Sequence, residues 1–126
     1  MTFLQLVGNI VWILLGGLIS ALEYLLAGLL LCITIVGIPF GLQCFKIATV
    51  ILMPFGASIE RDPNAVVPLN CLMNLLWLIP GILISITHLV AGIGCFLTII
   101  GIPFGLMHFK LIKIAISPFG RIITRE

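Results

Sequence analysis

The sequence contains very little charge. Only 8% of its 126 residues are charged, whereas about 25% is usual in soluble domains. No Lys, Arg, Asp or Glu occurs between Asp62 and Lys110, which leaves 47 consecutive uncharged residues. Hydrophobic residues make up 62% of the chain, and a soluble fold of this size could not bury that much apolar surface, whereas a bilayer can receive it. The composition therefore predicts an integral membrane protein.

Several sequence signals are also missing. Met1 is followed by no basic leader and no A-x-A-like cleavage site, so we expect the first helix to remain as a signal anchor. The four cysteines form no C-x-x-C pair, which favours reduced, buried thiols over a disulfide framework or a zinc site. No nucleophile–base constellation, phosphate loop or metal-ligand spacing occurs, so we expect no enzyme, no cofactor and no bound metal.

The chain instead contains one sequence twice. The run Thr34–Gly41 (TIVGIPFG) returns as Thr98–Gly105 (TIIGIPFG), and the spacing of 64 residues holds onward to a Pro-Phe-Gly in each copy, at Pro54 and Pro118. A chain of this length is therefore two copies of one unit. The predicted boundaries are a first repeat at 1–56, a cytoplasmic linker at 57–68, a second repeat at 69–120 and a cytoplasmic tail at 121–126.

Apolar runs of membrane-spanning length predict an all-α protein with four transmembrane helices, two in each repeat. The expected spans are residues 4–22, 24–38, 69–87 and 89–102. Each pair would form a hairpin, with Glu23 or His88 at its turn. Gly16-Gly17 and Pro80-Gly81 predict a kink in the first helix of each pair.

Each hairpin is followed by an elbow in which proline stops the helix and the flanking glycines permit unusual backbone angles. The elbow residues are Gly37, Pro39 and Gly41, and Gly101, Pro103 and Gly105. The next segment, 42–53 in the first repeat, spans only about 18 Å as a helix, so we expect it to lie in the membrane interface. A re-entrant half-helix is the competing geometry. A proline elbow is sufficient explanation for the motif, although it could also gate or bind something.

The basic residues give the orientation. In this arrangement all six Lys and Arg lie on one side of the membrane, which the positive-inside rule makes cytoplasmic, together with both termini. The two repeats then point the same way, about an axis along the membrane normal. Lys46, Lys110 and Lys113 are expected to contact anionic lipid headgroups, as is His108. They are too few and too widely spaced for a nucleic-acid surface.

Two copies of N-x-x-W, T-I-[VI]-G-I-P-F-G, F-K and P-F-G together resemble the YccF family of bacterial inner-membrane proteins, whose repeat is called the inner membrane component domain. The resemblance covers residues 6–56 and 71–120. It implies a multi-pass protein of the bacterial cytoplasmic membrane, and it supplies no catalytic residues.

Four side chains are candidates for a pore or its mouth. Glu23 is the only acid inside either repeat, and it could form a ring of carboxylates at an outer mouth or be a hydrated turn residue. His88 occupies the matching turn of the second repeat, where its imidazole could titrate near neutral pH or simply be a hydrated turn residue. Asn9 and Asn74 each precede a tryptophan by three residues, which favours helix packing by the asparagine and headgroup anchoring by the tryptophan; pore lining is the alternative.

Three functions fit these features. The first is a self-associating protein that conducts ions along the axis of a homo-oligomer, because four short helices cannot enclose a water path alone. The second is a non-conducting scaffold or accessory subunit of a larger membrane complex, with an unidentified membrane protein partner. The third is a small dimeric transporter, which the shortage of intramembrane polar residues disfavours.

Overall fold

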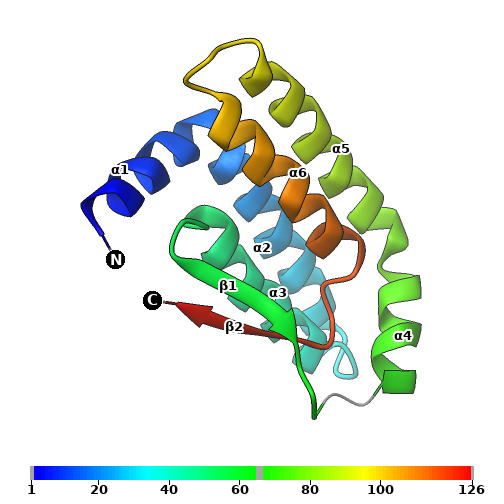
Figure 1. The fold of residues 1–126 in the computed structure, drawn as a ribbon. Coiled ribbons are helices and arrows are strands. Elements are labelled where there is room, and N and C mark those ends of the chain that lie inside the picture. The colour runs from blue at the N-terminus through cyan, green and yellow to red at the C-terminus, as the bar shows by residue number, and fades with distance from the viewer. Residues whose placement is uncertain (1, 65–66, 126) are drawn as a thin grey trace.

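The computed structural model describes residues 2–64 and 67–125 and is mostly helical (Figure 1). Its helical elements are α1 (Phe3–Trp12), the π-helical η1 (Ile13–Gly17), α2 (Leu18–Ile33), α3 (Ile38–Leu52), α4 (Val67–Leu76), α5 (Leu78–Phe96) and α6 (Ile102–Ile116). Its strands are β1 (Ala57–Arg61) and β2 (Arg121–Arg125). Residues 1, 65–66 and 126, which belong to the predicted first repeat, linker and tail, lie outside the described residues.

Two helical segments are long and apolar enough to cross a membrane. They are Phe3–Ile33, with a mean hydropathy of 2.0, and Leu78–Phe96, with a mean hydropathy of 1.9. The predicted hairpin boundaries are wrong, because α2 continues through Glu23 and α5 continues through His88. The chain reverses instead at the elbows, and the hairpins are α2 with α3 and α5 with α6.

The predicted kinks are present, and each has an identifiable cause. In the first copy the helix breaks at η1, where Leu15 leaves helical geometry and Gly16 has a φ of 115°. In the second copy α4 ends at Leu76 and α5 begins at Leu78. Pro80 explains that break, because a proline ring clashes with the carbonyl four residues earlier, which here belongs to Leu76.

The elbows bend as predicted, but their glycines act by allowing close approach. Gly37 has an ordinary φ of −83°, and the positive-φ residues in the described chain are Gly16, Gly56 and Gly120. A Cβ at Gly41 would lie 2.6 Å from the carbonyl oxygen of Gly28, so these two glycines let α2 and α3 touch. α3 begins at Ile38, before the predicted Leu42, because Pro39 fits the first turn of a helix, where no donor is needed.

The second copy repeats this packing. Gly105 approaches the carbonyl of Gly92 in the same way, at 2.9 Å from its would-be Cβ. Thr34 and Thr98 close the two turns identically, since each hydroxyl donates to a carbonyl three residues earlier and accepts from the amide of Gly37 or Gly101. The elbow motif therefore encodes a tight helical hairpin.

A two-stranded antiparallel sheet joins the copies, and the sequence did not predict it. β1 occupies the start of the predicted linker and β2 most of the predicted tail. Ile59 pairs with Ile123, its own counterpart 64 residues later, so the register places a local two-fold axis through this pair. Both isoleucines turn inward and pack against the core. The sheet thus covers one side of the helices, beside α3 (Figure 1).

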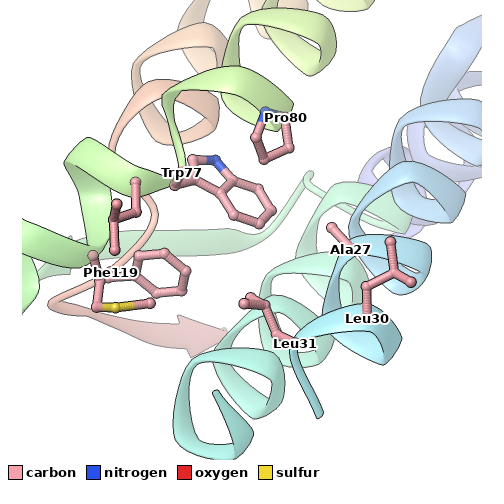
Figure 2. A pocket seen from close by; sticks show the side chains of 8 residues that line it. Ala27, Leu30, Leu31, Trp77, Pro80 and Phe119 are labelled. Atoms are coloured by element: carbon pink, nitrogen blue, oxygen red, sulfur yellow. The ribbon is translucent and has the colours of Figure 1, made fainter. Parts of the chain in front are cut away.

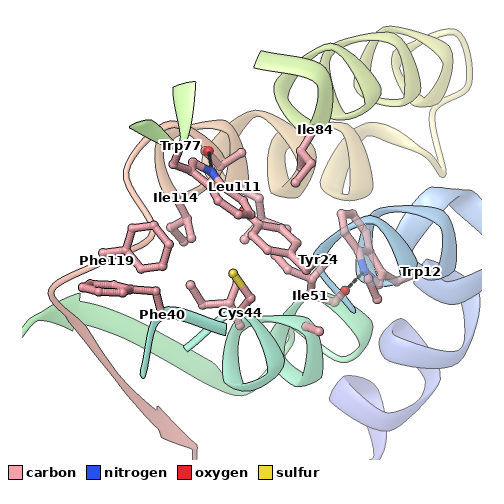
Figure 3. Close-up of a cluster of buried hydrophobic side chains, with 14 of the residues drawn as sticks. Trp12, Tyr24, Phe40, Cys44, Ile51, Trp77, Ile84, Leu111, Ile114 and Phe119 are labelled. Atoms are coloured by element: carbon pink, nitrogen blue, oxygen red, sulfur yellow. Dashed lines mark hydrogen bonds between the residues drawn. The ribbon is translucent and has the colours of Figure 1, made fainter. Parts of the chain in front are cut away.

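The core lies between the two hairpins. Figure 3 shows Tyr24, Cys44 and Ile51 of the first copy facing Trp77, Leu111 and Ile114 of the second. The outer surfaces of α1, α2, α4 and α5 are apolar and exposed, as in Leu26 and Leu83, whose side chains are 61% and 60% exposed. The molecule therefore has an apolar helical layer and, across the core, a sheet that carries charge.

Candidate functional site

Glu23 and Thr87 meet where α2 and α5 pack together. They are counterparts, 64 residues apart, and the Thr87 hydroxyl donates a hydrogen bond of 3.1 Å to Glu23 Oε2. The other carboxylate oxygen, Oε1, is buried and has no hydrogen-bond partner in the described part of the chain. Glu23 therefore lies half-buried at a helix seam, and the prediction of a hydrated hairpin turn is wrong.

A buried histidine pair lies next to this seam. His88 Nδ1 is 2.9 Å from His108 Nδ1, and His108 Nε2 is 3.0 Å from the carbonyl oxygen of Leu15. Both imidazoles are 0% exposed. The predictions of a wetted His88 and of a headgroup contact for His108 are therefore wrong.

The contacts assign the protons of this pair. The Leu15 carbonyl can only accept, so His108 Nε2 carries the hydrogen and His108 Nδ1 is the acceptor. His88 Nδ1 must then donate to it. The kink at Gly16 makes the first bond possible, because helical geometry would direct the Leu15 carbonyl into its own helix. His88 Nε2 is left as a buried acceptor without a partner among the described residues.

The counterparts of the two histidines are Tyr24 and Cys44. Both are buried in the core, and the Tyr24 hydroxyl is the third buried side-chain atom without a partner in residues 2–64 and 67–125. Each copy also places a tryptophan beside its partner's cluster. Trp12 lies 4.1 Å from the His108 ring and Trp77 stacks on Tyr24 at 5.9 Å.

These residues are polar side chains of α2, α3, α5 and α6 that lie in or beside the core, and we refer to them together as the seam cluster. Its members are Glu23, Tyr24, Cys44, Thr87, His88 and His108. Sequence reasoning missed Tyr24, Cys44 and the burial of His108. The repeat contained a usable signal, because both copies have a polar residue at the equivalent positions 24 and 88. A hairpin turn alone does not require a polar residue there in both copies.

The two asparagines have the packing role that the sequence favoured. Asn9 donates to the carbonyl of Phe55 at 3.1 Å and accepts from its amide at 2.8 Å, and Asn74 does the same with Phe119. Each asparagine therefore fastens its helix to a Pro-Phe-Gly turn. These bonds use both ends of the amide, so the structure does not support a pore-lining role.

The tryptophans are core residues, and the prediction of headgroup anchoring is wrong. Trp12 is 0% exposed and donates to the Ile51 carbonyl, and Trp77 donates to that of Ala115. Because residues three apart share a helix face, each N-x-x-W pair docks one helix at two points on its own repeat.

The basic residues lie on α3, α6, β1 and β2. Lys46 lines a hollow together with Arg121, while Lys113 is exposed on α6. Burial lowers the pKa of the Arg121 guanidinium, and the charge of Arg61 lowers it further, but an arginine still remains protonated at neutral pH. Headgroup contact by the lysines stays a prediction.

No group of three or more His, Cys, Asp or Glu in the described residues is arranged to hold a metal ion. All four cysteines are free thiols, of which Cys44 and Cys95 are buried and Cys71 is exposed. The seam cluster therefore offers hydrogen-bonding and ionisable groups.

Known proteins resemble this chain over most of its length. The family model for the inner membrane component domain, YccF, matches residues 7–57 and 72–121. The inner membrane protein YccF of Escherichia coli K12 is 34% identical over 122 residues, which cover 90% of this chain and 82% of that protein. The YccF protein of Shigella flexneri matches equally well. No solved structure matches.

Proposed function

The chain belongs to the YccF family of inner membrane component proteins, and we propose that it is a self-associating protein of the inner membrane that conducts a small cation along the axis of a homo-oligomer, past the Glu23 end of the seam cluster. The observation that carries this proposal is the burial of three polar atoms without partners, at Glu23, Tyr24 and His88. Unsatisfied polar groups at membrane depth are expensive and are usually retained for a function.

The charge distribution supports an orientation in the membrane. All basic residues lie on the sheet or on the two helices beside it, whereas α1, α2, α4 and α5 expose apolar side chains. The positive-inside rule then directs the sheet to the cytoplasm, with both termini on that side. The two-fold axis through Ile59 and Ile123 lies along the membrane normal in this orientation, and the two repeats point the same way.

This orientation can be tested by labelling cysteines in a variant whose four native cysteines are replaced by alanine. Ser58→Cys, on the exposed face of β1, should react with a membrane-impermeant maleimide in inside-out vesicles but not in right-side-out vesicles. Leu26→Cys, in the apolar layer, should react in neither, because lipid or another subunit covers it. Labelling of Ser58→Cys from the outer side would reverse the proposed topology.

The position of Glu23 supports self-association. Its carboxylate stands at the seam between α2 and α5, and exposed apolar side chains flank it, among them Leu22, Leu26 and Ile86. Glu23 is half-buried, and an acidic side chain that borders hydrocarbon is unfavourable, whereas one that borders another copy can be hydrated or shared. Apposed copies would bring several Glu23 carboxylates around one axis, which is the arrangement of a cation-selective ring.

The experiment is native mass spectrometry of the protein in nanodiscs, followed by proton and potassium flux measurements in liposomes. We expect one closed oligomer and a flux that Glu23→Gln lowers about tenfold, which corresponds to about 1.4 kcal/mol in the barrier. Lys113→Gln, which removes a charge far from the seam, is the control. A monomer would contradict the conduction mechanism, since one copy cannot surround a pore.

A scaffold is the second candidate, favoured by the extent of the apolar layer, which could equally receive a different membrane protein. An oligomer that carries no flux, with Glu23→Gln indistinguishable from the wild type, would support this function. The Glu23–Thr87 bond would then be a packing contact only.

A further inference from the structure

An apolar groove opens between α2 and the junction of α4 and α5. Its volume is about 240 Å³, and its walls come from α2, α4, α5 and the turn before β2. Figure 2 shows Ala27, Leu30 and Leu31 on one side and Trp77, Pro80 and Phe119 on the other. The groove lies in the apolar layer and is large enough for part of an acyl chain.

A polar hollow adjoins this groove at Phe119, which lines both. The hollow has a volume of about 410 Å³, and its polar side chains are Gln43, Asp62, Asn70 and Arg121. The Arg121 Nε donates to the Ser117 carbonyl at 2.6 Å, which fixes the guanidinium at the edge of the sheet. Groove and hollow together lead from the apolar layer to the charged sheet.

The hollow carries both signs of charge. The Asp62 amide donates a hydrogen bond of 2.9 Å to the carbonyl of Gly120, which is the residue before Arg121. Asp62 and Arg121 therefore lie near each other. Asp62 Oδ1 accepts from the amide of Asn64, and no ion pair joins the Asp62 carboxylate to Arg121 in the part of the chain that is described. Two opposite charges that share a hollow without pairing fit a ligand that carries both.

The other half of the molecule shows that the fold does not require a guanidinium at the position of Arg121. The counterpart of the groove is a cleft of about 400 Å³ beside Val11, Ala91 and Cys95. There, however, the position of Arg121 is Ala57 and that of Gln43 is Met107. Only one of the two equivalent clefts therefore has an arginine at this position.

We propose that this groove and hollow bind a phospholipid with a zwitterionic primary-amine headgroup. Arg121, with the Asn70 amide, receives the phosphate, Asp62 receives the ammonium, and an acyl chain lies between Ala27 and Trp77. A bidentate guanidinium suits phosphate, and a primary ammonium has three hydrogens to donate to a carboxylate. The orientation agrees with the bilayer, because the headgroup lies at the level of the sheet.

The test is native mass spectrometry of the whole protein released from nanodiscs that contain equal parts of phosphatidylethanolamine, phosphatidylcholine and phosphatidylglycerol. We expect the wild type to retain phosphatidylethanolamine preferentially. Arg121→Gln should lower its retention about tenfold, the loss expected for one charge-assisted hydrogen bond. Asp62→Asn should abolish the preference for phosphatidylethanolamine over phosphatidylglycerol, because the carboxylate no longer repels an anionic lipid.

A matched pair of variants separates this site from general lipid contact. Ala27→Phe should fill the groove and release the lipid, whereas Ala91→Phe fills the cleft in the other copy and should leave retention unchanged. Equal retention of phosphatidylethanolamine and phosphatidylcholine by the wild type would overturn the proposal, as would a wild-type preference for phosphatidylglycerol.

Discussion

Replacing Gly41 by alanine is expected to destabilise the protein by about 1–3 kcal/mol, the usual cost of inserting a methyl group into a packed interior. The new Cβ would lie 2.5 Å from Cys32 Sγ and 2.6 Å from the Gly28 carbonyl oxygen. The sulfur can rotate away, but the carbonyl belongs to the backbone of α2, so α2 and α3 must separate. The measurement is the midpoint of thermal unfolding in one detergent.

Gly94→Ala is the matched control, because it adds the same methyl group to α5. Nothing lies within 4 Å of a Cβ at Gly94, and alanine is the better helix former by about 1 kcal/mol, so this variant should unfold at the same or a higher temperature. Gly105→Ala should fall between the two, since its nearest neighbour is at 2.9 Å. If Gly41→Ala and Gly94→Ala unfold alike, the two helices do not touch through Gly28 and Gly41.

The repeat predicted the parts of this fold that depend on local chemistry. Pro39 and Pro103 bend the chain where expected, and the bounds of α3 and β1 recur 64 residues later in α6 and β2. Proline acts through its own ring and its missing donor, so its effect can be read from neighbouring residues alone.

The errors came from partners that are distant in the sequence. Glu23 resembled a turn residue because a charge in an apolar run suggests water, whereas its actual partner is Thr87, 64 residues away. Likewise, His108 next to Lys110 resembled an interfacial residue, and only the fold brings it to His88 and to the Leu15 carbonyl. β1 was not predicted for the same reason, since a five-residue polar segment becomes a strand only when β2 pairs with it.

These distant contacts also explain why the candidate site differs from the predicted one. The sequence placed Glu23 and His88 at the mouths of two separate hairpins, whereas the structure pairs Glu23 with Thr87 between α2 and α5, and His88 with His108 between α5 and α6. The repeat aligns Glu23 with Thr87 and Tyr24 with His88, so the two copies supply different chemistry at equivalent positions. The scaffold is thus symmetric, while its polar groups are not.

His108→Leu is expected to be the most damaging change in the seam cluster. It leaves the His88 Nδ1 hydrogen and the Leu15 carbonyl without partners, and a buried polar group without a partner costs about 1–3 kcal/mol. It also removes the ring on which Trp12 lies. The variant should therefore unfold at a lower temperature than the wild type. If α1 also becomes mobile, the kink at Gly16 depends on the bond between His108 and the Leu15 carbonyl.

The first copy supplies the compensating change. The double variant His88→Tyr with His108→Cys places in the second copy the residues that occupy the equivalent positions of the first, Tyr24 and Cys44. It removes the unpartnered His88 hydrogen but restores no bond, because the Tyr24 hydroxyl has no partner in the described part of the first copy, and the Leu15 carbonyl also stays without one. Each single change breaks the same bond between His88 and His108. The two changes should thus be coupled, with the double variant more stable than the sum of the single losses.

The same double variant separates stability from conduction. If the histidines carry protons, a folded protein with Tyr and Cys at these positions should retain its oligomeric state and lose its proton flux. Nitrogen chemical shifts of the wild type should show hydrogen on His88 Nδ1 and on His108 Nε2, the tautomers that the Leu15 contact requires. Undiminished proton flux in the folded double variant would mean that the pair only holds α1 in its kinked position, and conduction would then depend on Glu23 alone.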